Sequence, residues 1–238
     1  MANNYFQFKQ FTIYQDQCAM KVTSDACLFG AITAAKFIGE THLKILDIGT
    51  GTGLLSLMVA QKNTTSKIDA VEIDEAAALQ VKKNVAESAF ASQIEVYKSD
   101  IKQFDNNHSY DFIITNPPFF ENDLKSIKDN RNKALHDASL TLDELLKQFD
   151  RLLKPGGLVS ILLPYHRTDY FIAMASKLKW YCSKRINVKQ TENHDYFRGI
   201  LCFNKTESIT EKTSLIIKQE GEYSNDFKQL LKDYYLHL

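Results

Sequence analysis

The sequence has few cysteines, and none of them is spaced to share a metal ion or to form a redox pair. The four residues Cys18, Cys27, Cys182 and Cys202 are scattered, and no C-x-x-C pair occurs. This spacing argues against a zinc or thiol redox motif. We therefore expect no metal, and reduced thiols in a cytoplasmic protein.

The chain also lacks a net charge. Its 29 Lys and Arg residues balance 29 Asp and Glu residues. Attraction to a nucleic acid therefore has to come from local clusters and not from the overall field. This balance argues against a non-specific nucleic-acid coat protein.

Long apolar runs are missing as well. No stretch approaches the roughly 20 residues of a membrane helix, and the first residues have neither the basic start nor the apolar core of a signal peptide. Internal repeats and low-complexity linkers are not seen either. At 238 residues and 44% hydrophobic residues, the chain is expected to be one soluble catalytic unit, monomeric and without a membrane partner.

From residue 44 onward, short apolar runs alternate with amphipathic stretches, which is typical of a parallel sheet with crossover helices. Strands are predicted at residues 45–48, 68–73, 94–97, 112–115 and 158–163, and helices at residues 54–61, 75–88, 142–153 and 171–179. Alternation at residues 183–190 and 196–204 predicts a closing antiparallel hairpin. Residues 1–43, with an aromatic-rich start and a helical pattern at 25–37, are predicted to cap the binding edge of the main domain at 44–238.

A glycine-rich turn follows the first predicted strand. Gly49, Gly51 and Gly53 lie where ligands bind at the edge of an open α/β sheet, and a Cβ there would obstruct the approach of a cofactor to the backbone. Leu54 stands where a dinucleotide fingerprint needs its third glycine. The spacing therefore favours S-adenosylmethionine (SAM) over NAD. Asp47, before the turn, is expected to accept from the ammonium group of the cofactor or to orient the turn.

Two acidic residues at the ends of later strands extend the predicted cofactor site. Glu72 follows Gly53 by 19 residues (72 − 53), close to the ~20-residue spacing at which a carboxylate meets ribose hydroxyls in this fold class. Capping a helix is the alternative role for Glu72, although Asp74 is the better N-cap. Asp100 is expected to accept from the adenine amine of the cofactor, and its alternative is a solvated turn acid.

The most specific motif, Asn116-Pro117-Pro118-Phe119, follows the fourth predicted strand at the same edge. An adenine amine is a poor nucleophile because its lone pair is delocalised, so catalysis has to favour the pyramidal amine of the transition state. The side-chain oxygen of Asn116 and the carbonyl of Pro117 can each accept one amine N–H, and the prolines hold that carbonyl in place. Phe119 offers a ring on which a flipped-out base can stack. A plain Pro-Pro turn is the alternative.

The glycine turn and the Asn-Pro-Pro-Phe motif resemble those of class I amino-methyltransferases. Residues 6–11, 18–22, 223–224 and 233–236 are similar to the signatures of the bacterial tRNA1(Val) adenine-37 N6-methyltransferase family. The resemblance implies an α/β, Rossmann-like fold whose mostly parallel sheet has seven strands, with an antiparallel C-terminal hairpin and a small N-terminal cap. It also implies SAM as cofactor and tRNA as partner.

The same resemblance assigns roles by position. Asn116, Pro117 and Phe119 are expected to hold the target base. The residues expected to contact SAM are Ser24, Asp25, Asp47, Gly49, Gly51, Gly53, Glu72, Ile73, Asp100, Ile101 and Asn116. Besides the ring of Phe119, the candidate RNA contacts are the basic residues Lys21, Lys184, Arg185 and Arg198. The last three are chosen because basic residues cluster around them, and a solvated surface is the alternative.

The sequence departs from the family pattern at two places. The family motif Met-Lys-Val-Gly-Thr-Asp-Gly ends here in Thr23-Ser24-Asp25-Ala26. Both glycines of the motif are therefore replaced, which predicts a stiffer loop. The usual Ala-Arg-His appears as Ala134-Leu135-His136, which removes a cation that can touch RNA phosphate. His136 has an equally plausible role as a plain helix-end residue.

Three other functions stay open at this point. A protein glutamine methyltransferase faces the same lone-pair problem at an amide nitrogen, and a methyltransferase of a guanine amine in ribosomal RNA is also compatible with Phe119. The third is a SAM- or RNA-binding module without transfer activity, which would have no use for an intact Asn116 and Pro117. Methylation of an adenine in tRNA is the preferred interpretation.

Overall fold

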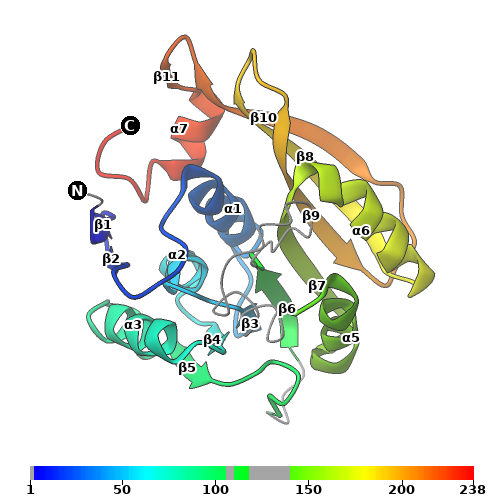
Figure 1. Cartoon of the computed structure of the whole chain (residues 1–238), viewed down its shortest axis with the longest axis horizontal. Helices are drawn as coiled ribbons and strands as arrows, with labels where there is room; N and C mark the ends of the chain where they lie inside the picture. The colour runs from blue at the N-terminus through cyan, green and yellow to red at the C-terminus, as the bar shows by residue number, and fades with distance from the viewer. Residues whose placement is uncertain (1–2, 106–109, 118–139) are drawn as a thin grey trace, which may run out of the picture.

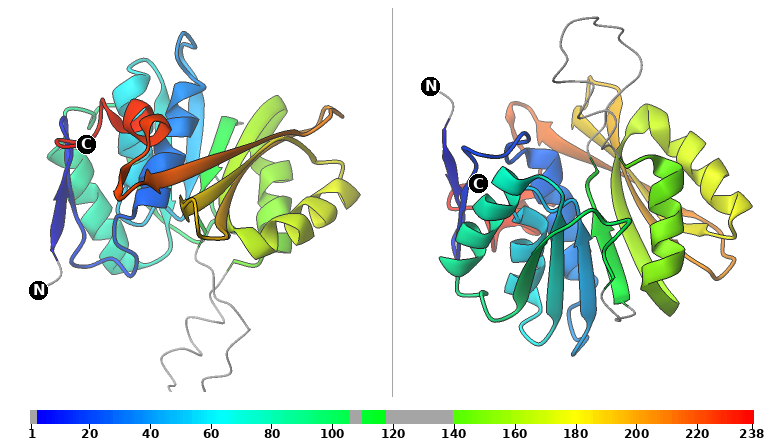
Figure 2. Two further views of the ribbon diagram at one scale, coloured as in Figure 1. Left: turned by 90° about the horizontal axis from the view of Figure 1, so that it is seen from above. Right: turned by 60° about the horizontal axis from the view of Figure 1, so that its bottom comes forward.

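The computed structural model describes residues 3–105, 110–117 and 140–238. A large sheet runs through the middle of the molecule (Figure 1), and helices cover both of its faces (Figure 2). This arrangement confirms the predicted α/β, Rossmann-like fold.

Five parallel strands carry the predicted motifs. They are β3 (Lys44–Ile48), β4 (Lys67–Glu72), β5 (Ile94–Lys98), β6 (Tyr110–Thr115) and β7 (Leu153–Pro164). The first four, β3 to β6, lie close to their predicted positions because their apolar runs are buried between helices on both faces of the sheet. β7 begins earlier than predicted, since Leu153 already pairs with Tyr110, and the register shifts before the next pair, Phe112 with Leu158. Gly156, whose φ is 81°, lies in this interval.

The other strands extend the sheet beyond β7. β8 (Tyr181–Thr191) and β9 (Tyr196–Asn204) form the predicted hairpin, and β9 is antiparallel to β7. β10 (Glu211–Gln219) then pairs in parallel with β8, and β11 (Glu222–Tyr223) pairs antiparallel with β10. Over the described residues, the sheet has nine strands in the order β11-β10-β8-β9-β7-β6-β3-β4-β5, which is two more than expected.

The two extra strands escaped prediction because their sequence signal is weak. The first four residues of β10 are polar and exposed, and only Leu215 and Ile217 of this strand are buried. Such a stretch has too few apolar residues to show a clear alternation. Its position near the edge of the sheet explains why so little burial is needed.

The helices form two layers. On one face, α1 (Ser24–Ala35), α2 (Leu54–Lys62), α3 (Glu75–Ala86) and α7 (Asn225–Leu231) share a hydrophobic cluster with the sheet. On the other face, α5 (Leu142–Leu152) and α6 (Tyr165–Lys177) do the same. α6 starts before its predicted first residue, 171. The prediction missed the first turn because this turn is rich in polar residues and carries little apolar periodicity.

The N-terminal segment is attached to the rest of the chain at several points. Its strands β1 (Tyr5–Gln7) and β2 (Thr12–Tyr14) pair antiparallel. Phe8 is 2% exposed and forms a bridge with Tyr235, near the C-terminus. The backbone N–H of Lys9 donates to the carbonyl of Tyr234 at 2.8 Å. The aromatic start of the chain therefore packs on the C-terminal segment, and the stretch after β2 leads back to α1.

The packing of α7 gives the first testable prediction. Phe227 is fully buried in the cluster with α1, and its ring stacks on Tyr223 with centroids 4.5 Å apart. We expect Phe227→Ala to lower the free energy of unfolding by about 3–5 kcal/mol, because it empties a packed site. Tyr5→Ala is the control, since Tyr5 is 51% exposed, and it should cost about 0.5 kcal/mol. Urea denaturation measures both, and equal losses would contradict the packing of α7.

Candidate active site

The predicted motifs meet at the carboxyl edge of the parallel strands. Asp47 of β3 pairs in register with Ala70 of β4 and with Ile114 of β6. Neighbouring strands lie about 4.8 Å apart, so the ends of β4 and β6 flank the glycine turn that follows β3. The pairing therefore brings Glu72 and Asn116 to either side of this turn.

The glycine turn has the backbone shape that its sequence predicts. Gly49, Gly51 and Gly53 have φ values of 68°, 57° and 82°, in the left-handed region that favours glycine. A Cβ on Gly53 would also lie 2.6 Å from Cγ2 of Val81. Gly53 is the N-cap of α2 and offers no side-chain acceptor. The N–H groups of the first turn of α2 therefore suit an anionic group of a ligand.

The carboxylate of Asp47 lies beneath the glycine turn and is fully buried. Its Oδ2 accepts hydrogen bonds from the hydroxyls of Thr50 and Ser56, both at 2.7 Å. Its Oδ1 has no hydrogen-bond partner among the described residues. Burial raises the pKa of Asp47 to about 6 against the effect of the two hydroxyls, and the charge of Glu72 raises it further. Asp47 thus orients the turn and keeps one acceptor for a cation such as an ammonium group.

Glu72 is held in place by two backbone donors. Its Oε2 accepts from the N–H of Gly51 at 2.9 Å, and its Oε1 accepts from the N–H of Asp74 at 3.0 Å. Each carboxylate oxygen has a second lone pair, which leaves acceptors for ribose hydroxyls. Asp74 accepts from the N–H of Ala77 and is the N-cap of α3. The adjacent Ile73 is 44% exposed and offers apolar surface at the same edge.

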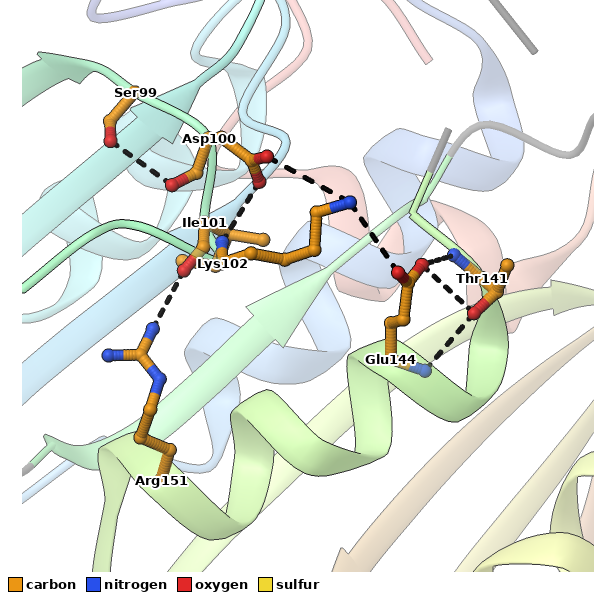
Figure 3. A network of polar contacts seen from close by, with 7 residues as sticks. All are labelled: Ser99, Asp100, Ile101, Lys102, Thr141, Glu144 and Arg151. Atoms are coloured by element: carbon orange, nitrogen blue, oxygen red, sulfur yellow. Dashed lines mark hydrogen bonds and ion pairs between the residues drawn. The ribbon is translucent and has the colours of Figure 1, made fainter. Parts of the chain in front are cut away.

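A polar network fixes the turn after β5 (Figure 3). Oδ1 of Asp100 accepts from the N–H of Lys102 at 2.9 Å. The Nζ of Lys102 lies 3.9 Å from Oδ2 of Asp100 and 3.5 Å from Oε1 of Glu144. Glu144 completes a capping box with Thr141 at the start of α5. The side chain of Asp100 is 23% exposed, so it keeps surface for a ligand.

Arg151 fixes the same turn from the other end of α5 (Figure 3). Its guanidinium donates to the carbonyl of Ile101 at 2.7 Å and to that of Phe104 at 2.8 Å. Ile101 itself is buried. The turn that carries Asp100 and Ile101 is therefore braced against both ends of α5.

Asn116 and Pro117 follow the end of β6 directly. The hydroxyl of Thr115 donates to the carbonyl of Ile48 at 2.9 Å and ties the end of β6 to the end of β3. Asn116 is half-buried and Pro117 is buried. Phe119 and His136, which the sequence also singles out, lie outside the described residues.

Two further predicted residues begin α1. Asp25 is largely buried and accepts from Nε of Arg198 at 2.7 Å, and Ser24 precedes it as the first residue of the helix. Arg198 pairs with Pro164 at the end of β7. Asp25, which was predicted to contact the cofactor, and Arg198, which was predicted to contact RNA, thus form an ion pair.

The remaining predicted RNA contacts differ in exposure. Lys21 is exposed. Lys184 donates to Glu211 at 2.8 Å, and Arg185, whose side chain is 8% exposed, forms an ion pair with Asp169. Together with Arg198, three of the four predicted cations already have an acidic partner. Their contacts with RNA stay predictions.

Asn84 of α3 is a residue that the sequence interpretation missed. It is 1% exposed, and its Oδ1 accepts from the N–H of Tyr14 at 3.0 Å. Its Nδ2 donates to the carbonyls of Tyr14 and Thr52, both at 2.9 Å. Asn84 therefore links the N-terminal hairpin to the glycine turn. The sequence did contain a sign of this role, because Asn84 is a polar residue between Val81 and Val85 on the buried face of α3.

Comparisons with known proteins show the family and the fold of the chain. Residues 30–179 match the family model of the methyltransferase small domain. The fold is similar to that of a predicted O-methyltransferase from Agrobacterium tumefaciens, with a TM-score of 0.68 and 15% identity over 87% of this chain and 95% of that chain. A putative RNA methyltransferase from Pyrococcus horikoshii has a TM-score of 0.53 and 18% identity over 76% and 81%. The protein is a class I methyltransferase that uses SAM as its methyl donor.

Three relatives narrow this class, and each is named a tRNA1(Val) (adenine(37)-N6)-methyltransferase. The protein of Dyadobacter fermentans is 44% identical over 98% of both chains. That of Bacteroides thetaiotaomicron is 40% identical over 100% of both chains, and that of Photorhabdus laumondii is 38% identical over 98% of this chain and 95% of its own. The chain belongs to the tRNA1(Val) (adenine(37)-N6)-methyltransferase family.

Two features are absent from the described residues. None of the helices there is long and apolar enough to cross a membrane. No group of three or more His, Cys, Asp or Glu side chains in the same residues is placed to hold a metal ion.

Glu72 gives a test of the cofactor site. We expect Glu72→Ala to weaken SAM binding about ten- to a hundredfold, because charge-assisted hydrogen bonds are worth roughly 1.5–3 kcal/mol. Calorimetry on the folded variant measures this change. Glu75→Ala is the matched control, since Glu75 is exposed and carries the same charge three positions further on. Unchanged affinity in Glu72→Ala would contradict the assignment.

Asn84 gives a second test, for which the chain offers a close control. Asn63 is also buried and bonded, since its Nδ2 donates to the carbonyls of Phe37 and Glu40, but it follows the far end of α2. Changing either residue to Ala should lower the free energy of unfolding by roughly 1–3 kcal/mol. Only Asn84→Ala should also weaken SAM binding, by about five- to tenfold, because the glycine turn loses a hydrogen bond. Equal SAM affinity in both variants would refute the link.

Proposed function

We propose that this chain transfers the methyl group of SAM to N6 of adenine 37 in tRNA1(Val), and that Asn116 and Pro117 hold the reacting amine. The observation that best supports this proposal is the register of β6 against β3. Ile48 pairs with Thr115, so Asn116 follows β6 at the level where the glycine turn follows β3. A base held by Asn116 thus lies next to a cofactor held by that turn.

The residues around the proposed cofactor site suit the chemical groups of SAM. The free Oδ1 of Asp47 suits its ammonium group, and the start of α2 suits its carboxylate. Glu72 suits its ribose, while Ile73 and Asp100 suit its adenine. When bound, SAM supplies an electrophilic methyl group on a positively charged sulfur. The protein then has to hold the amine nitrogen in line with that methyl group.

Asn116 and Pro117 act on the amine by accepting its two N–H groups. The side-chain oxygen of Asn116 accepts one and the carbonyl of Pro117 accepts the other, which directs the nitrogen lone pair toward the methyl group. Both hydrogen bonds strengthen as the nitrogen gains positive charge, so they stabilise the transition state more than the ground state. Neither acceptor has to remove a proton before the transfer.

The acceptors are fixed in advance by their neighbours. Pro117 restricts Asn116 to extended geometry, and the hydrogen bond from Thr115 to Ile48 fixes the end of β6. Little reorganisation is then needed when the base arrives, which is the condition under which electrostatic stabilisation is most effective. This preorganisation suits catalysis better than it suits a binding module without activity.

The family, and not the local geometry, favours tRNA over the other substrates. An amide nitrogen of a protein glutamine or an amine of a guanine can in principle be held by the same two acceptors. The relatives named for adenine 37 match this chain along its whole length, including the ends outside the methyltransferase domain model. We infer that the protein acts as a cytoplasmic monomer and that Lys21, Lys184, Arg185 and Arg198 contribute to RNA binding.

We also infer that residues 1–43 serve as a cap on the cofactor site, in one structural unit with residues 44–238. The stretch after β2 lies close to the acidic residues of that site. Burial raises the pKa of the Cys18 thiol to about 11, and the nearby charges of Glu72 and Asp74 raise it further. The backbone N–H of Gln17 also donates to Gln80 of α3 at 3.2 Å.

Asn116→Ala tests the proposed mechanism. We expect single-turnover transfer to a tRNA1(Val) transcript to slow about a hundred- to a thousandfold, because loss of one preorganised partner costs roughly 2.7–4 kcal/mol of barrier. SAM affinity in calorimetry should stay close to that of the unchanged protein. A transcript with guanosine in place of adenine 37 is the substrate control and should accept no methyl group. Near-normal turnover of Asn116→Ala would disprove its role, and methylation of the control transcript would disprove the target.

A further inference from the structure

Two tyrosines outside the sites described so far lie together at the carboxyl edge of the sheet. Tyr165 directly follows β7, and Tyr196 begins β9. Their ring centroids are 5.1 Å apart and their planes are inclined by 38°. Both side chains are half-buried and thus keep part of their surface open to solvent.

The pair lies close to β6, the strand that Asn116 follows. β7 pairs with β6 through Thr115 and Ile161, and β9 pairs with β7 through Arg198 and Pro164. β9 is therefore two strands from β6, a separation of roughly 10 Å at about 4.8 Å per strand. The two rings thus lie along the same edge of the sheet as Asn116.

Each ring is accompanied by a cation. The guanidinium of Arg185 lies 5.2 Å from the ring centroid of Tyr165, and Nζ of Lys189 lies 5.1 Å from that of Tyr196. Both distances are typical of cation–π contacts. Rings next to cations are what proteins use to hold single-stranded nucleic acids, since bases stack on the rings and phosphates meet the positive charges.

Arg185 is positioned by its neighbours for this contact. Its Nε donates to Oδ1 of Asn187 at 2.8 Å, and its guanidinium forms an ion pair with Asp169 of α6. The acidic group on α6 is thus neutralised by Arg185. Lys189 is then the better placed of the two cations to meet a phosphate, because the charge of Arg185 is already compensated by Asp169.

Enzymes that modify a base take it out of its stack, which leaves the adjacent bases without a stacking partner. A ring supplied by the protein can replace the lost partner. Stacking on a ring is tolerant of sequence because every base has a π-face, so such a contact adds affinity without selecting the neighbouring base.

We propose that Tyr165 and Tyr196 form a stacking platform for a nucleotide adjacent to the methylated adenine, with Lys189 next to its phosphate. The proposal rests on the proposed function, because it needs a single-stranded loop of RNA delivered to Asn116. It assigns RNA binding to an aromatic surface on a chain that has no net positive charge.

The test compares three variants in steady-state methylation of tRNA1(Val). Tyr196→Ala should raise KM for tRNA about ten- to a hundredfold, because stacking is worth roughly 1–3 kcal/mol per base, and should leave SAM affinity unchanged. Tyr196→Phe keeps the ring and should behave like the unchanged protein. Tyr170→Ala is the matched control, since Tyr170 lies on α6, is 59% exposed and has the guanidinium of Arg167 5.4 Å from its ring centroid. It should leave KM unchanged.

The outcomes separate the platform from the proposed function. If the unchanged protein methylates adenine 37 and Tyr196→Ala keeps its KM, the platform is wrong and the function stands. If Tyr196→Phe is as defective as Tyr196→Ala, the hydroxyl matters and stacking is wrong. If the unchanged protein does not methylate adenine 37, the proposed function fails. In that case, fluorescence anisotropy with a labelled anticodon stem-loop tests the platform by itself. The platform requires that Tyr196→Ala binds the stem-loop more weakly than Tyr170→Ala does.

Discussion

The buried carboxylate of Asp47 is the interaction on which the rest of the site depends. It joins the end of β3 to the glycine turn through Thr50 and to α2 through Ser56. The turn then presents the N–H of Gly51 to Glu72. Burying a carboxylate is costly unless hydrogen bonds compensate, and the raised pKa of Asp47 reflects that cost. A cationic ligand group near its free oxygen would offset the cost further.

Much of this site could be predicted from the sequence because its residues are fixed by local rules. An apolar strand followed by glycines defines the turn, and the spacing from Gly53 to Glu72 reflects one helix and one strand of a parallel fold. Asn116 could be placed in the same way, since it follows an apolar run and precedes two prolines. These features depend on residues close together in the chain, so one sequence is enough to locate them.

Other features depend on contacts between distant parts of the chain and could not be found in this way. Asn84 meets Tyr14 from 70 positions away, and the two rings at 165 and 196 come together only through the pairing of β7 with β9. β10 is stabilised by its place beside β8 more than by its own apolar residues. The acidic partners of Lys184, Arg185 and Arg198 are likewise invisible in the sequence, where each appears as a free positive charge.

The bridge between Phe8 and Tyr235 joins residues 227 positions apart (235 − 8). Such a contact closes a long loop, which costs more entropy than a local contact does. The N-terminal hairpin is also the segment that Asn84 connects to the glycine turn. The hairpin therefore completes its packing only when both Asn84 and the residues near 235 lie beside it. Through the hairpin and Asn84, Tyr235 is thus connected to the glycine turn, although the two lie far apart in the chain.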